Sequence, residues 1–172
     1  MSEGGTQDLT RLLKERAALL ARRDTAQNQA ILLPHVAFQS AGELFAVPLH
    51  FVVHASRLRH LTPIPGGPPY LIGVCALGGH LVTVLDVATF LDLRQRGLDD
   101  VTCCLVVSER GRELGLCAER LLGIEDIPPT ACQAWSCGHA AVTQVATVLG
   151  KRFLILDLPQ LLADPRLVEE SL

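Results

Sequence analysis

The residue types in this sequence that are most able to do chemistry are cysteine and histidine. Its 172 residues contain six of each. The best candidate for a metal site is Cys132-x4-Cys137-x-His139, in which two thiolates and an imidazole could ligate a zinc ion. Structural zinc sites usually have four ligands in two pairs, and no second pair stands at a suitable spacing. The pattern favours reduced thiols over a metal site, and a thiol or metal-dependent enzyme stays open as an alternative function.

The other four cysteines lie in or near apolar runs typical of β-strands. They are Cys75, Cys103, Cys104 and Cys117. Because a reduced cysteine behaves as a small apolar side chain, we expect them in strands or in the core. A disulfide framework is typical of small secreted chains and is not expected here. His54 and His80 are isolated from other ligand types, which favours surface or hydrogen-bonded histidines over a catalytic base.

Two aspartates each follow an apolar run and precede a short helical pattern. Asp86 stands before 87–91, and Asp157 stands before 158–162. An aspartate at that position accepts hydrogen bonds from the first backbone N–H groups of a helix, worth about 1 kcal/mol. We therefore interpret both as helix caps and not as a catalytic pair. The sequence has no phosphate-binding loop and no G-x-S-x-G motif, so we predict no catalytic residues, no cofactor and no metal.

Composition limits the classes of partner. The net charge is −3 and aromatic residues make up 4%, which argues against a basic, base-stacking surface for nucleic acid. No apolar run approaches the roughly 20 residues of a membrane-spanning helix, and residues 1–16 do not resemble a secretory signal. We therefore predict a cytoplasmic protein without direct membrane insertion. Its length fits one compact domain with a hydrophobic core.

The chain divides into a helical start and a β-rich remainder. Residues 1–33 contain leucines at helical spacing among charged residues, which predicts an amphipathic helix. This helix could pack on the domain or dock on another protein. Beyond Pro34, short apolar runs are separated by Gly, Pro and Asp, which predicts about nine or ten strands. The proline-rich segments 63–69 and 128–129 are expected in loops.

A repeat of about 70 residues relates two parts of the β-rich region. Residues 76–93 align with 147–164, and 43–53 resembles 113–123 at nearly the same offset. In both copies of the longer segment, the pattern predicts a turn, then an apolar strand, then a Leu-Asp pair and a helical turn. This pattern predicts a duplicated unit and two related small barrels, in which a sheet of about five strands closes on itself and so removes its exposed edges.

Several short motifs stand in a characteristic order between Val36 and Leu162. They are Leu44-Phe45-Ala46-Val47-Pro48-Leu49 with Val52, Leu61-Thr62-Pro63-Ile64-Pro65 before Gly73, Leu77 and Gly79 ahead of Val84-Leu85-Asp86-Val87, the segment 115–124, and Ile155-Leu156-Asp157-Leu158 before Leu161-Leu162. In order and spacing, this set resembles the CheW domain of bacterial chemosensory adaptors and of CheA kinases. The resemblance covers most of the chain.

The resemblance implies a mainly β fold of two intertwined SH3-like five-stranded barrels. It divides the chain into a helical extension over 1–33, a CheW-like domain over 34–165 and a tail over 166–172. It also implies a non-enzymatic adaptor that couples the cytoplasmic tip of a chemoreceptor to the regulatory domain of a CheA-type histidine kinase, in chemotaxis or a related pathway such as pilus or surface motility. Such a protein would be recruited to receptor arrays. A CheW-like interaction module that has lost this coupling is the alternative.

The same resemblance indicates where partners would bind. The positions are Val52, His54, Gly73, Leu77, Gly78, Gly79 and Asp86. Two of them depart from the family pattern, since His54 stands where a glutamate is common and Gly78 where an arginine is common. If the family's glutamate and arginine form an ion pair, we expect both to be absent together, because a partly buried charge without its counter-ion destabilises the protein. We therefore expect His54 and Gly78 to tune the choice of partner.

Overall fold

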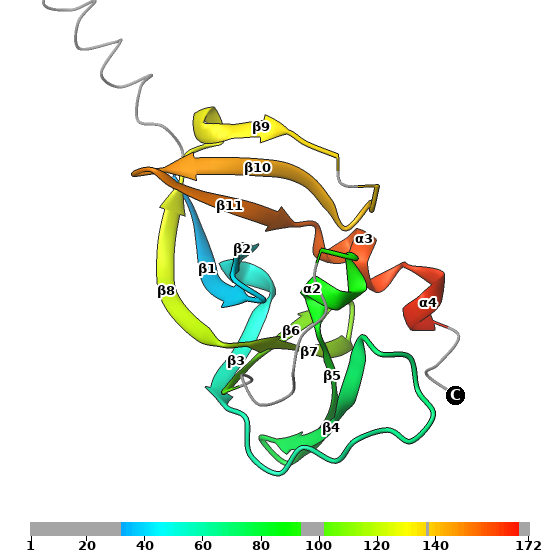
Figure 1. The fold of residues 1–172 in the computed structure, drawn as a ribbon. Coiled ribbons are helices and arrows are strands. Elements are labelled where there is room, and N and C mark those ends of the chain that lie inside the picture. The colour runs from blue at the N-terminus through cyan, green and yellow to red at the C-terminus, as the bar shows by residue number, and fades with distance from the viewer. Residues whose placement is uncertain (1–31, 94–101, 137, 169–172) are drawn as a thin grey trace, which may run out of the picture. The chain divides into compact units, whose positions relative to one another are not determined.

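The structure is a computed structural model that describes residues 32–93, 102–136 and 138–168, and strands dominate this part of the chain (Figure 1). The predicted amphipathic helix falls within residues 1–31, which lie outside the described residues. The described chain forms two sheets, called sheet A and sheet B below. The mainly β class predicted from the sequence is therefore confirmed.

Sheet A has six strands and sheet B has five. The hydrogen-bonded order in sheet A is β8 (Arg120–Ile127), β1 (Leu33–Ser40), β2 (Glu43–Pro48), β11 (Lys151–Leu156), β10 (Val142–Val148) and β9 (Cys132–Ala134). The order in sheet B is β3 (Val52–Arg57), β6 (Cys103–Glu109), β7 (Arg112–Ala118), β5 (His80–Leu85) and β4 (Leu71–Leu77). Short helical segments among the described residues are α2 (Val87–Phe90), α3 (Leu158–Leu162), α4 (Pro165–Val168), and the 3-10 turns η1 (Leu49–Phe51) and η3 (Pro129–Ala131).

Each sheet combines strands from both halves of the chain. Sheet A joins the early hairpin β1–β2 to the late strands β8 to β11, and sheet B joins β3 to β5 to the hairpin β6–β7. Two parallel pairings attach the exchanged hairpins: Phe45 of β2 lies opposite Leu154 of β11, and Gly115 of β7 lies opposite Val84 of β5. These two pairings are related by the same offset of about 70 residues that relates the sequence segments. The sheets are therefore intertwined, as predicted.

Four hairpin turns share one backbone geometry. Each has two residues at positive φ, and the second of them is glycine. This is the type I′ pattern, whose twist matches the twist of the flanking strands. The turns are Ala41-Gly42, Gly78-Gly79, Arg110-Gly111 and Leu149-Gly150. Corresponding hairpins in the two halves of the chain therefore use the same kind of turn.

The structure differs from the predicted strand set at two places. The run 113–121 is divided near Glu119, because β7 pairs with β6 in sheet B while β8 crosses to pair with β1 in sheet A. Strand β9 adds to β10 through three residue pairs, so sheet A has six strands and the prediction of five is wrong for this sheet. A strand of three residues is too short to show an alternating pattern in the sequence.

The buried apolar side chains of the described residues form three clusters. The largest is shared by both sheets and includes Phe38 and Phe45 from sheet A, whose stacked rings lie 5.4 Å apart, with Leu105 and Leu116 from sheet B. A second cluster around Phe153 lies within sheet A, and a third lies within sheet B. Several strands are thus buried on both faces, which is why they read as continuous apolar runs and why the apolar content reaches 49%.

Both predicted helix caps are present. Asp86 Oδ1 accepts hydrogen bonds from the backbone N–H groups of Ala88 at 3.1 Å and Thr89 at 3.2 Å, and Oδ2 accepts one from the Thr89 hydroxyl at 2.8 Å. Asp157 Oδ1 accepts one from the N–H of Gln160 at 3.1 Å. The two aspartates therefore fix the first turns of α2 and α3, as the sequence predicts.

The chain continues to pack on the domain after residue 165, in the segment assigned to a tail from the sequence. Arg166 donates a hydrogen bond to the backbone oxygen of Phe90 at 3.2 Å, and its guanidinium lies 3.8 Å from the centre of the Phe90 ring. Hydrogen bonds from Arg166 to the Asp164 carboxylate hold the pKa of Asp164 below its usual range. Leu167 is buried in the shared cluster. These contacts attach α4 to α2.

His35 is a histidine buried in sheet A, with 5% of its surface exposed. Its Nδ1 lies 2.7 Å from the backbone oxygen of Leu33 and donates a hydrogen bond to it. Burial lowers the pKa of His35 below its usual value, an effect that the Leu33 hydrogen bond opposes and that the neighbouring His50 adds to. The folded protein therefore favours the neutral ring.

We expect the free energy of unfolding to fall as the pH falls. The unfolded histidine takes up a proton near pH ~6.5 and the folded one only at lower pH, so stability present above that value is lost on acidification. Chemical denaturation at about pH 7.5 and about pH 5.5 should show a smaller loss for His35→Gln than for the wild type. His54→Gln, at an exposed position, should keep the wild-type loss. Equal losses in all three proteins would contradict this account of His35.

Candidate functional site

The structure brings three of the seven predicted partner-binding positions into one groove. His54 of β3 lies there with Leu77 at the end of β4 and Gly78 in the turn that follows, around an open hollow of about 520 Å³. The remaining lining residues are Ser56, Arg57, Arg59, His60 and Ala76. This surface is called the β3–β4 groove below. His54 and Gly78, the two positions that depart from the family pattern, therefore share one surface.

The curl of sheet B creates the β3–β4 groove. Strands β3 and β4 stand at opposite ends of the hydrogen-bonded order, yet residues from both line the same hollow. No backbone pairing joins β3 to β4 within the described residues, so the sheet curls but stays open where a closed sheet is predicted from the sequence. The segment that connects β3 to β4 is attached to β4 by Thr62, which exchanges two backbone hydrogen bonds of 2.8 Å with Val74.

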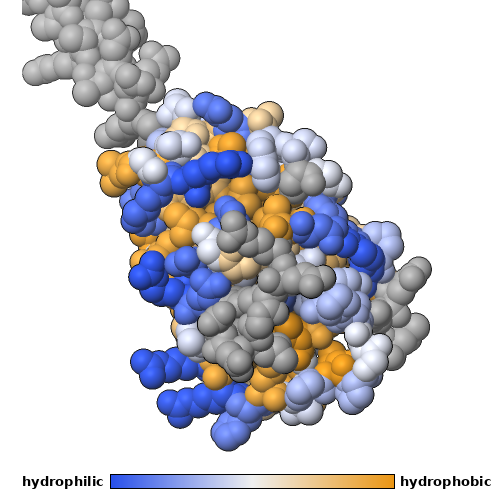
Figure 2. Space-filling view, in the orientation of Figure 1, coloured by the Kyte–Doolittle hydropathy of each residue, from blue (hydrophilic) through white to orange (hydrophobic). Residues whose placement is uncertain are grey.

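The groove is rich in basic groups. Arg57 and Arg59 supply permanent positive charges, His54 and His60 lie beside them, and no acidic side chain is among the lining residues. None of these four side chains forms an ion pair in the part of the chain that the structure describes. Figure 2 shows hydrophilic side chains along the lower left edge of the molecule, where β3 ends in Figure 1. This local positive charge contrasts with the net charge of −3.

The other four predicted positions do not line the groove. Val52 is half-buried against the shared cluster, and Gly79 is exposed in the turn between β4 and β5. Gly73 is buried, and a Cβ atom there would lie 2.5 Å from the backbone oxygen of Thr62. Asp86 is 3% exposed and its carboxylate caps α2. Gly73 and Asp86 therefore support the fold and offer little surface to a partner.

Five of the groove residues are not predicted from the sequence: Ser56, Arg57, Arg59, His60 and Ala76. A signal for the basic ones is present, because the run 57–60 holds three basic residues in four positions directly after a predicted strand. Such a run is usually a solvated surface. Only the curl of sheet B shows that these residues face the turn after β4.

Three of the cysteines predicted to be buried pack together inside sheet B. They are Cys75, Cys104 and Cys117. Burial raises the pKa of the Cys75 and Cys104 thiols, and the neighbouring Cys75 adds to the effect on Cys104. Because the thiolate is the nucleophile and the metal ligand, the raised pKa values make Cys75 and Cys104 poor nucleophiles and poor ligands. The prediction that these cysteines lie in the core or in strands is confirmed, since Cys75, Cys104 and Cys117 are buried and Cys103 lies in β6.

The structure places Cys132 and His139, two members of the candidate metal motif, in different surroundings. Cys132 packs against the cluster within sheet A. His139 lies beside α4, with Nε2 3.3 Å from a carboxylate oxygen of Asp92 and Nδ1 3.2 Å from a guanidinium nitrogen of Arg166. Cys137 lies outside the described residues. The short spacing of Cys132 and His139 in the sequence therefore does not bring them to one site.

Intertwined β-sheets with an open surface groove define a small β-rich domain whose exposed chemistry suits binding. The chain matches the family model of the CheW-like domain over residues 34–166, and it therefore belongs to the CheW-like domain family. None of the helices that the structure describes is long and apolar enough to cross a membrane.

Two curated relatives are similar over part of their length. The chemotaxis protein CheW of Bacillus subtilis strain 168 is 28% identical over 80 residues, which cover 46% of this chain and 51% of the relative. Protein FrzA of Myxococcus xanthus is 31% identical over 88 residues, which cover 51% of this chain and 55% of the relative. The chain thus spans about half the length of the curated relatives it matches.

A solved structure shares the fold. The crystal structure of the scaffolding protein TtCheW from Thermoanaerobacter tengcongensis matches with a TM-score of 0.64 and 21% identity, covering 73% of this chain and 89% of that one. This similarity confirms the fold class that the resemblance implies.

Gly73 and Gly78 should respond differently to substitution, because only Gly73 is enclosed. We expect Gly73→Ala to lower the free energy of unfolding by about 1–3 kcal/mol, since its Cβ would collide with the Thr62 backbone. Gly78→Asn should change it by less than about 0.5 kcal/mol, because the position has open space and asparagine tolerates positive φ. Urea denaturation of the two variants measures both values. A Gly73→Ala protein as stable as Gly78→Asn would contradict the structural role of Gly73.

Proposed function

We propose that this chain is a non-enzymatic adaptor in chemotaxis-type signalling. The observation that carries the proposal is the match to the CheW-like domain over 34–166. The names of its relatives support it, since one is a chemotaxis protein and one similar structure is a scaffolding protein. In this proposal the chain acts in the cytoplasm and is recruited to receptor arrays. It couples the cytoplasmic tip of a chemoreceptor to the regulatory domain of a CheA-type histidine kinase.

A bridging protein needs at least two binding surfaces, and the described residues contain two suitable hollows. One is the β3–β4 groove of sheet B. The other is a largely apolar hollow of about 430 Å³ on sheet A, lined by Leu33, Pro34, His35, Pro48, Leu49 and His50. Apolar anchors on such surfaces give specific and reversible contacts between proteins. The raised pKa values of the buried Cys75 and Cys104 thiols argue against the alternative that the chain is a thiol enzyme.

A second candidate function is a CheW-like interaction module that has lost array coupling. His54 and Gly78 favour it, because they lack the charges common at these positions in the family. The two functions differ in whether the chain binds two partners simultaneously. An adaptor holds a kinase regulatory domain and a receptor tip in one complex, whereas an uncoupled module binds one of them or neither.

Substituting both divergent positions tests whether they tune partner choice. The adaptor should form a ternary complex with a CheA regulatory domain and a receptor cytoplasmic fragment from the same organism. We expect His54→Glu with Gly78→Arg to change the Kd for at least one of them by about tenfold, because a charge pair then crosses the groove. Arginine is tolerated at this backbone geometry, since Arg110 occupies the matching turn position with φ 51°.

The measurement is calorimetric titration of each partner, followed by size-exclusion chromatography of the three-component mixture. Arg110→Gln, on a different hairpin, is the control and should leave both affinities unchanged. Unchanged affinities in the double variant would remove the groove from partner recognition. Failure of the wild type to form the ternary complex would contradict the adaptor function itself.

A further inference from the structure

The β3–β4 groove holds hydrogen-bond donors that the fold does not use. Arg57 and Arg59 line it without an ion pair among the described residues. The hydroxyl oxygen of Ser56, another lining residue, is buried and has no hydrogen-bond partner in the same part of the chain. Buried polar atoms are normally hydrogen-bonded, so an unused one at a surface hollow calls for an explanation.

We propose that the β3–β4 groove binds a segment of the partner protein through its aspartate or glutamate side chains. The inference rests on the proposed function and specifies the chemistry of its partner. Arginine presents planar paired donors that match a carboxylate, and such charge-assisted hydrogen bonds are stronger than neutral ones. Arg57 at the end of β3 and Arg59 in the following loop would supply them.

The groove fits a protein segment better than a phosphate-rich surface. It is concave, and Leu77 and Ala76 add apolar wall beside the cations, so it can hold a side-chain stem as well as a charge. Anionic membranes and nucleic acids are bound by larger clusters of lysine and arginine, whereas this groove has two arginines in a chain of net charge −3. Residues 94–101, outside the described residues, contain two arginines and two aspartates and so add no net charge.

Peptide probes test this inference directly on the full chain. The probes are a short fluorescein-labelled peptide of alternating leucine and glutamate and a matched peptide with glutamine in place of glutamate. Fluorescence anisotropy should show that the glutamate peptide binds at least about tenfold more tightly at low salt. The difference should shrink between about 20 mM and about 150 mM salt, because exposed charges are screened over that range.

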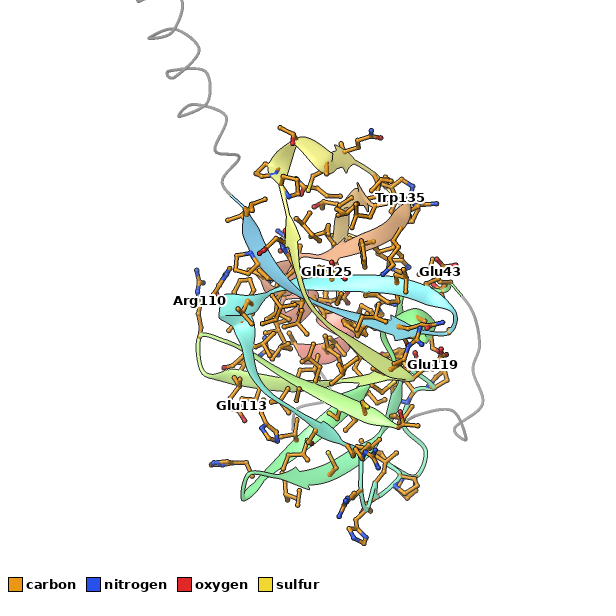
Figure 3. The ribbon with its side chains drawn as sticks, turned by 90° about the vertical axis from the view of Figure 1, so that its left-hand side faces the viewer. Glu43, Arg110, Glu113, Glu119, Glu125 and Trp135 are labelled. Carbon is orange, nitrogen blue, oxygen red and sulfur yellow. The ribbon has the colours of Figure 1, made fainter. Side chains whose placement is uncertain are left out.

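Paired variants separate the groove from general surface charge. Arg57→Gln with Arg59→Gln should weaken the glutamate peptide about tenfold and leave the glutamine peptide unchanged. Arg57→Lys with Arg59→Lys should retain part of the preference, since the charge remains while the planar geometry is lost. The matched control is Arg110→Gln with Lys151→Gln, which removes two exposed cations from other hairpins. Figure 3 shows Arg110 projecting from the turn between β6 and β7. This control should bind like the wild type.

Three results would overturn the inference. The first is equal affinity of the wild type for the two peptides. The second is an equal loss of affinity for the glutamate peptide in the groove variants and the control variant. The third is a wild type that binds phosphatidylserine vesicles but does not bind the glutamate peptide. Each of them leaves the adaptor function intact, because that function is judged by the ternary complex of kinase domain and receptor fragment. Conversely, a chain that prefers the glutamate peptide but forms no ternary complex would keep the carboxylate-binding groove and lose the adaptor role.

Discussion

The exchange of hairpins between the two sheets is the constraint on which the rest of this structure depends. Sheet A is completed by the parallel pairing of β2 with β11, and sheet B by the pairing of β7 with β5. The shared apolar cluster then buries one face of both sheets at once. Neither sheet has all its strands or its full core without residues from the other half of the chain. The interior therefore forms as one unit, although the chain passes between the sheets more than once.

The exchange of hairpins leaves polar side chains at the end strands of sheet B and apolar side chains in the interior. The interior takes the apolar strands and the Cys75, Cys104 and Cys117 thiols, as the apolar runs around these cysteines predict. The end strands β3 and β4 stay unpaired with each other and leave an opening at the curl of sheet B. Basic side chains at the end of β3 gather around that opening. The apolar interior of the two sheets thus positions the residues that line the β3–β4 groove.

Much of the fold could be predicted because its signals are local. The apolar runs, the Leu-Asp caps at Asp86 and Asp157 and the glycine turns each depend on a few neighbouring residues. Strand β9, with three residues, and the docking of Arg166 onto Phe90 depend on contacts distant in sequence, so they left no periodic signal. For the same reason, the family resemblance indicates His54 and Gly78 but not Arg57 or Arg59, whose place in the groove depends on how sheet B curls.

The most direct test of this account is native-state hydrogen exchange of the full chain, followed by mass spectrometry across a guanidinium series. If the exchanged hairpins make the two sheets one cooperative unit, amides of β2 and β11 in sheet A and of β5 and β7 in sheet B should lose protection with the same dependence on denaturant. Loss of protection in one sheet while the other stays protected would show that the sheets fold separately and would contradict the central claim.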